Sequence, residues 1–304
     1  MSISQTYFST LALTAVFLCH CQTTADRAEL EVARERVVVC NGVTITVVSL
    51  PGGTTLGDVT LGANGNIFVS DRADVFGVLA NAGQGQVNVG VDATTGSVAS
   101  IAPVTLRDRA IVSGSVTSAS SIALQNGVVV TGAVQPFTPL SASNAASIRV
   151  TFPDAPSGGI QLSPNATGSL APGDYASVSL GASAVLTLSP GTYSLNSLVL
   201  EPNSEIRLPA GNQPVLIAVK SSLIYRGEIK AVDGSDLNLL LLYIGTAPAT
   251  LERRFNGFYV GMDSSLTLTG NGVTYRGAFF ARDITVTPDL IVQHRAFDPS
   301  AFSP

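Results

Sequence analysis

The stretch Ala110-Ile111-Val112-Ser113-Gly114-Ser115-Val116 recurs further along the chain as Val128-Val129-Val130-Thr131-Gly132-Ala133-Val134. Each copy sets β-branched residues around one glycine. A fixed short period rich in Val, Ile and Thr is typical of a solenoid, in which each coil buries its inner face by stacking on its neighbours. The repeat therefore predicts an all-β chain folded as a right-handed parallel β-helix (β-solenoid), with about 18 residues per coil.

The same step returns after a break. Pro172-Gly173-Asp174-Tyr175 recurs one period later as Pro190-Gly191-Thr192-Tyr193. Residues 135–160 lie between the regular regions and are rich in Pro and Ser, which predicts a loop or linker. The sequence thus predicts an N-terminal half of the β-helix over 37–134 and a C-terminal half over 161–304. Whether they form one continuous solenoid stays open, and about 13 coils are expected at this period.

Six glycines recur at the coil spacing. We expect them at corners, where the chain needs a positive φ or a close approach of two backbones. They are Gly77, Gly96, Gly114, Gly132, Gly173 and Gly191.

The composition suits a well-packed globular chain. Charged residues make up 12% of the 304 residues, against about a quarter in ordinary domains. The apolar run 237–244 predicts a strand buried on both faces. The net charge is −5 and basic residues do not cluster, so the chain lacks the electrostatic footprint of a nucleic-acid-binding protein.

The N-terminal region predicts export. The apolar run 11–18 within residues 1–25 has the length of a signal-peptide core and is too short to cross a bilayer. Cys21, close behind Cys19, is the candidate for lipidation, and the alternative is an ordinary signal peptide that contains cysteine. Residues 26–36 are charged and predict a short helix or tether. The expected location is the periplasm, the outer membrane surface or the extracellular space, with the membrane reached only through a lipid anchor.

Two resemblances follow from the motifs. Residues 56–134, with Val-x-Gly-x-Val in each coil, resemble bactofilins, the polymer-forming β-helix proteins of bacteria. Residues 165–297 resemble an uncharacterised β-helical domain of exported bacterial proteins, some of them associated with type IV pilus assembly. Both likenesses imply a β-helix and no particular chemistry; bactofilins are cytoplasmic and lack a signal peptide, whereas the second likeness implies an exported protein. The motifs that carry the second likeness are Leu188 to Tyr193, Phe255 to Val260, Tyr275 to Ala281 and His294 to Phe297.

Many parallel β-helices degrade polysaccharides, and such an enzyme needs acids gathered on one face. Asp71 and Asp108 align two coils apart, but each stands beside Arg, which predicts a surface row of ion pairs. His294 and Asp298 could form part of a Ser-His-Asp site, yet the chain has no Gly-x-Ser-x-Gly elbow. We expect His294 to cap the last coil. No catalytic residue, cofactor site or metal site is predicted.

Two repeated residue types suggest binding. Tyr175 and Tyr193 stand one period apart and could stack sugar rings, although aromatic stacks also stabilise coils. The pairs Thr267/Thr269 and Thr285/Thr287 align over two coils, as in solenoids that bind ice, but two rungs are too few for such a site, and strand propensity explains them.

The sequence favours a non-catalytic, exported structural or adhesive module of a bacterial cell envelope that self-associates through its coil edges. The alternative is a carbohydrate-binding or polysaccharide-degrading β-helix. The expected partners are polysaccharide, other envelope proteins or further copies of the chain.

Overall fold

The computed structural model describes residues 38–40, 43–153, 156, 158–209, 213–234, 238–270 and 272–302. The chain divides into two compact units, Met1–Val32 and Ala33–Pro304, and all described residues belong to the second. The signal segment 1–25, Cys21 and the charged segment 26–36 therefore lie outside the described part.

Short parallel strands stack into about 11 coils, which confirms the predicted β-solenoid. The described residues contain no α-helix, and the two helical turns are the 3-10 segments η1 (Leu56–Asp58) and η2 (Pro299–Phe302). Each coil passes over three faces. We call them the covered face, the open face and the charged face.

The strands of each face pair with strands of the coils above and below. The covered face contains β3 (Val59–Ala63), β6 (Val78–Asn81), β9 (Val98–Ser100), β12 (Val116–Ser118), β15 (Val134–Gln135) and β25 (Leu239–Tyr243). The open face contains β4 (Ile67–Val69), β7 (Val87–Val89), β10 (Val104–Leu106), β13 (Ile122–Leu124), β17 (Ile160–Leu162) and β26 (Ala249–Leu251). The charged face contains β5 (Asp74–Phe76), β8 (Thr94–Thr95), β11 (Ile111–Val112), β14 (Val129–Val130), β18 (Thr167–Leu170), β20 (Val185–Leu188), β22 (Glu205–Leu208), β24 (Glu228–Ala231) and β29 (Ile291–His294).

Longer strands pass from one face to the next. Three of them turn from the covered face onto the open face, and two run from the charged face over the covered face to the open face. The former are β19 (Gly173–Leu180), β21 (Gly191–Leu200) and β23 (Val215–Tyr225), and the latter are β27 (Asn256–Leu268) and β28 (Thr274–Val286).

The coils differ in length. Leu61 pairs with Leu79, 18 residues further along the chain, which is the regular spacing. Leu198 pairs with Leu223, 25 residues further along. These longer coils, together with strands that leave the stack, give fewer coils than the ~13 expected from the regular period.

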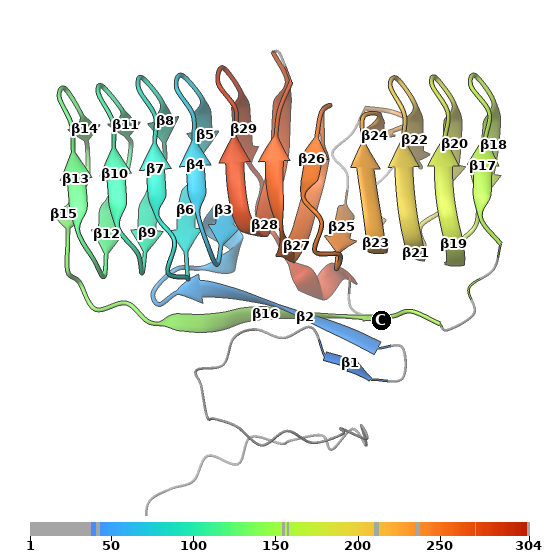
Figure 1. Ribbon diagram of the computed structural model, residues 1–304, viewed down its shortest axis with the longest axis horizontal. Coiled ribbons are helices and arrows are strands. Elements are labelled where there is room, and N and C mark those ends of the chain that lie inside the picture. The colour runs from blue at the N-terminus through green and yellow to red at the C-terminus, as the bar shows by residue number, and fades with distance from the viewer. Residues whose placement is uncertain are drawn as a thin grey trace, which may run out of the picture. The chain divides into compact units, whose positions relative to one another are not determined.

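The chain enters the solenoid in its middle. From β3 it coils outward until β15, and from β17 it coils inward until β28 and β29. The last coils then pair in parallel with the first, β28 with β3 and β4, and β29 with β5 (Figure 1). The two halves therefore form one continuous stack, and we call the junction the seam.

Three strands lie outside the coils. They are β1 (Val38–Cys40), β2 (Val43–Pro51) and β16 (Ala142–Thr151), and β2 pairs antiparallel with both others. The region 135–160, expected as a loop or linker, thus contains a long strand. Likewise, the first residues of the expected N-terminal half belong to this separate sheet rather than to a coil.

This separate sheet packs on the covered face and creates a second hydrophobic core outside the coils. Leu50 and Ile148 from the sheet meet Leu240 and Phe280 from the coils, with Phe302 of η2 at the margin. Every residue of β25 is consequently buried, as the apolar run 237–244 predicts.

A residue in the left-handed backbone conformation recurs at the corner between the open and charged faces, which we call the left-handed corner. The non-glycine residues there have φ between 56° and 62°, a backbone conformation that costs energy for any residue with a Cβ. They are Arg72, Asp92, Arg109, Asn165, Ser183, Asn203 and Asp289.

The six glycines expected at corners fall into two groups. Gly77, Gly173 and Gly191 have positive φ values of 121°, 154° and 134°. Gly96 and Gly114 are instead crowded by the neighbouring coil, since an added Cβ would clash with the Gly77 carbonyl oxygen and the Ser97 hydroxyl, respectively. Gly132 repeats this crowding against the Ser115 hydroxyl.

Candidate functional site

The open face carries one outward-pointing residue at the centre of each strand, and these residues form a continuous line. They follow one another in register from coil to coil across the seam, and between Ile224 and Thr250 the register is set by the adjacent pair Tyr225–Leu251. We call this line the central row, and it contains Gln161, Ser179, Val199, Ile224, Thr250, Thr267, Thr285, Phe68, Asn88, Thr105 and Ala123. None of these side chains is charged.

Three threonines lie together in the middle of this row. Thr250 pairs with Thr267, and Thr267 pairs with Thr285, so their side chains repeat at the spacing of parallel strands, about 4.8 Å. Thr269 and Thr287 follow two positions along the chain, one residue beyond the ends of β27 and β28, and Glu252 holds the equivalent position in the preceding coil. All five threonines are partly exposed. The middle of the open face therefore presents a small array of hydroxyl and methyl groups, bordered in the preceding coils by the ion pairs of Arg226 with Glu201 and Glu252.

Sequence periodicity found only part of this array. It aligned Thr267 with Thr285, but Thr250 lies one position too close to Thr267 for the regular step. It also could not place Phe68 beside Thr285, with Asn88 one coil further on, because Phe68 and Asn88 belong to the first coils and Thr285 belongs to the last. The seam between the first and last coils creates this neighbourhood.

The charged face differs in composition from the open face. Glu205 accepts hydrogen bonds from Lys230, at 2.6 Å, and from Arg207, at 2.9 Å. The bond from Lys230, followed by that from Arg207, outweighs burial and lowers the pKa of Glu205. Phe76 and Ile111 are also exposed on this face. The open face carries its charged residues beside the central row rather than in it, as in the ion pairs of Arg226 with Glu201 and Glu252.

A shallow hollow of about 330 Å³ adjoins the central row at Phe68. Asn88 and Ser70 line it, together with Arg107 and Asp71, whose nearest charged atoms lie 3.7 Å apart. Its polar groups can donate and accept hydrogen bonds beside one aromatic ring, which is the arrangement a sugar ring uses.

The ion pairs predicted near Asp71 and Asp108 lie along the left-handed corner. Arg109 makes two bonds to Asp92, at 2.6 and 2.7 Å, and Arg72 makes two bonds to Asp289, at 2.7 and 2.9 Å. Each links neighbouring coils. The Asp108 carboxylate accepts a backbone N–H from Asn126. These acids therefore tie coils together at the surface.

His294 lies at the seam and not at an open end. Its ring Nδ1 is 3.0 Å from the buried Thr60 hydroxyl, which donates to the Phe76 carbonyl. The Asp298 carboxylate instead accepts bonds from Ser300. The expectation that His294 caps a free last coil is wrong, because the last coil continues into the first.

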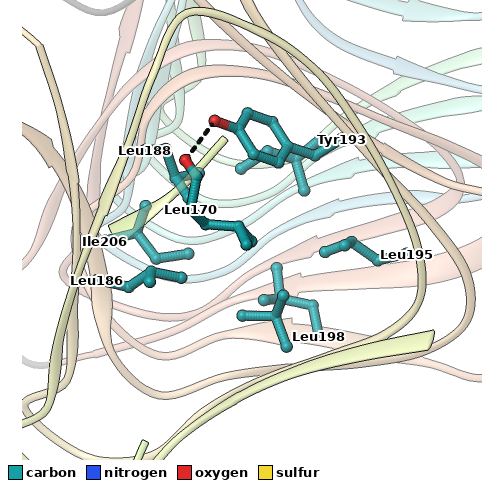
Figure 2. A pocket seen from close by; sticks show the side chains of 9 residues that line it. Leu170, Leu186, Leu188, Tyr193, Leu195, Leu198 and Ile206 are labelled. Carbon is teal, nitrogen blue, oxygen red and sulfur yellow. Dashed lines mark hydrogen bonds between the residues drawn. The ribbon is translucent and has the colours of Figure 1, made fainter. Parts of the chain in front are cut away.

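The two tyrosines proposed to stack sugars do not form a platform. Tyr193 is 1% exposed, and its ring points into the coil interior, where the hydroxyl donates to the Leu170 carbonyl (Figure 2). Burial raises the pKa of Tyr193 to about 12. Because this coil is longer than the regular period, Tyr193 pairs with Gly173, and Tyr175 pairs with Leu195. The prediction for Tyr193 is therefore wrong.

Within the described part of the chain, no three His, Cys, Asp or Glu side chains are grouped as metal ligands. The same residues include no helix long and apolar enough to cross a membrane.

No family model matches this sequence, and no curated protein matches it. A solved structure, titled as the crystal structure of an ice binding protein from an Antarctic bacterium, Flavobacteriaceae, is similar over 78% of this chain and 79% of that one. The two sequences are 13% identical and the TM-score is 0.27. The fold and the faces described above define a β-solenoid whose open face carries an uncharged central row, and its ligand must be argued from the residues.

Proposed function

We propose that this protein is a non-catalytic binding protein that adsorbs to ice through its open face. The in-register ladder Thr250–Thr267–Thr285, set in an uncharged row, carries the proposal. A ligand that contacts such an array along its whole length must itself repeat in two dimensions, and an ice surface does.

The chemistry of threonine suits this ligand. Its hydroxyl can both donate hydrogen bonds to water and accept them from water. Water molecules next to its methyl group have restricted orientational freedom. Its branched Cβ restricts the side-chain rotamer, so little conformational entropy is lost on binding. Charged groups would hold water in their own hydration shells, and the central row has none. The export signal expected over 1–25 is consistent with this function, because extracellular ice is met outside the cell.

A carbohydrate-binding function is the second candidate, favoured by the hollow beside Phe68. It accounts for one aromatic ring and the polar side chains around it. It leaves the threonine ladder unexplained, because sugar platforms rest on aromatic rings and Phe68 is the one aromatic member of the central row.

Partitioning into growing ice separates the two candidates. A solution of the protein is frozen slowly from a cold surface, and the protein concentrations in ice and liquid are compared. An ice-binding protein is enriched in the ice, whereas a sugar-binding protein is excluded like any other solute. Retention on insoluble polysaccharides, abolished by Phe68→Ala, would support the second candidate instead.

A further inference from the structure

The stack of coils ends in two sets of half-paired strands. At one end, which we call the first end, β13, β14 and β15 pair only with the preceding coil. At the other, which we call the second end, β17 and β18 pair only with the following coil. Figure 1 shows these two sets at opposite limits of the row of coils. Among the described strands of the solenoid, those at each end thus have one edge whose backbone N–H and C=O groups face no further strand.

The first end exposes residues of the solenoid's interior. Leu124 is 47% exposed although its partner one coil inward, Leu106, is fully buried. Val134 is 40% exposed, and its partner Val116 is likewise buried. Both side chains point inward, so they are exposed only because no coil follows. A further coil would bury them.

Among the described residues, neither end carries the features that protect open strand edges. Exposed edges are ordinarily blunted by charge, proline or a bulge, and solenoids by polar terminal repeats. Residues 110–148 contain no Asp, Glu, Lys or Arg, and neither do residues 156–173. Pro136 and Pro164 lie next to the edge strands rather than in them. The coils between the ends, by contrast, carry the ion pairs of the left-handed corner.

The two ends also match in direction and order. Every strand pair between coils is parallel, and the path advances the same way from β17 to the seam and from the seam to β15. A second copy placed on the first end would set β17 on β13, β18 on β14, and the start of β19 on β15. Inward residues would then meet inward residues, Ile160 above Ile122 and Leu162 above Leu124.

We propose that copies of this chain stack head to tail, the second end of one on the first end of the next, into a continuous solenoid. The contact joins two different surfaces and does not close on itself, so the product is a filament. Stacking would bury Leu124 and Val134 and would extend the central row from copy to copy.

The test is sedimentation velocity of the full chain over a range of concentrations, with electron microscopy of the same samples. The wild type should form species that lengthen with concentration. Leu124→Lys blocks the first end, and Ile160→Lys blocks the second. Each variant alone should be monomeric, and an equal mixture should form dimers and stop, because one intact end of each kind remains. Ile111→Lys, at an exposed site one coil inward, should assemble like the wild type.

A charge swap tests the same contact without touching the interior. Ala123 and Gln161 are exposed and would face each other across the junction. Ala123→Lys with Gln161→Lys should weaken assembly several-fold, since like charges directly opposite repel, whereas Ala123→Glu with Gln161→Lys should restore it. Wild-type protein that stays monomeric at every concentration would overturn the proposal. So would single end variants that dimerise alone, because identical ends would then be joining.

Discussion

Gly62 in the first coil lies directly opposite Phe280 in the last, and a Cβ added to Gly62 would clash with the Phe280 ring. Both residues are buried. The aromatic ring thus occupies the space that a side chain on Gly62 would need. This contact closes the seam, where the first and last segments of the solenoid sequence complete one stack.

The seam should not tolerate a side chain at position 62. We expect Gly62→Val to lower the free energy of unfolding by about 1–3 kcal/mol, because the added carbons overpack the Phe280 ring. Gly57→Val is the control, since nothing lies within 4 Å of a Cβ there. Denaturant unfolding of the three proteins measures the effect. Equal stability of both variants would mean that the seam is loosely packed.

A carboxylate holds the same seam together. The Asp283 Oδ1 accepts bonds from the backbone N–H and the side-chain amide of Asn66, both at 2.8 Å. Burial acts to raise the pKa of Asp283, but the bonds from Arg282 and Asn66 outweigh it, and the pKa is lowered. The carboxylate therefore stabilises the fold above its unfolded pKa of about 3.9, and this contribution is lost as the pH falls toward the lower folded value.

We accordingly expect Asp283→Asn to cost about 1 kcal/mol at pH 7 and nothing once the carboxyl is protonated at low pH. Unfolding curves at several pH values measure the difference. Asp174→Asn removes the same charge from an exposed site and controls for net charge. A cost that is independent of pH would show that shape rather than charge matters at position 283.

A buried tyrosine joins neighbouring coils. The Tyr275 hydroxyl is shared between the Leu251 and Thr269 carbonyls, at 2.5 and 2.6 Å, and the residue is fully buried. We expect Tyr275→Phe to lower the free energy of unfolding by about 1 kcal/mol, since it removes the only donor in this contact. Tyr175→Phe, at a partly exposed tyrosine bonded to Ala171, should change stability far less. Thermal unfolding of both variants decides the point.

Much of the solenoid could be predicted from sequence, because coils repeat a pattern of inward Val, Ile and Leu at nearly constant spacing. The seam could not, because pairs such as Thr285 and Phe68 are brought together by coil order and not by a period. The alignment of Tyr175 with Tyr193 failed for a related reason, since a slightly longer coil shifted the register. The strand β16 was hidden in a segment whose prolines suggested a loop.

The candidate face was predicted in part. Thr267 and Thr285 are separated by one regular coil and were visible as a repeat, while Thr250 completes the ladder only in three dimensions. Its setting in an uncharged row also depends on the order of the coils, which no local pattern records.

Binding to ice should be more sensitive to a bulky side chain in the threonine ladder than to the loss of a hydroxyl group. We expect Thr267→Tyr to abolish enrichment in ice, because the ring would hold the array away from a flat surface. Thr267→Val keeps the shape and should retain part of the binding. Thr187→Tyr places the same ring on the exposed charged face and should leave binding unchanged. Circular dichroism confirms that each variant is folded.

The most direct measurement is the ratio of protein in growing ice to protein in the surrounding liquid, for the wild type, Thr267→Tyr and Thr187→Tyr. The account predicts enrichment of the wild type and of Thr187→Tyr, with Thr267→Tyr excluded from the ice. Exclusion of the wild type, or equal enrichment of all three proteins, would contradict the assignment of the open face as an ice-binding surface.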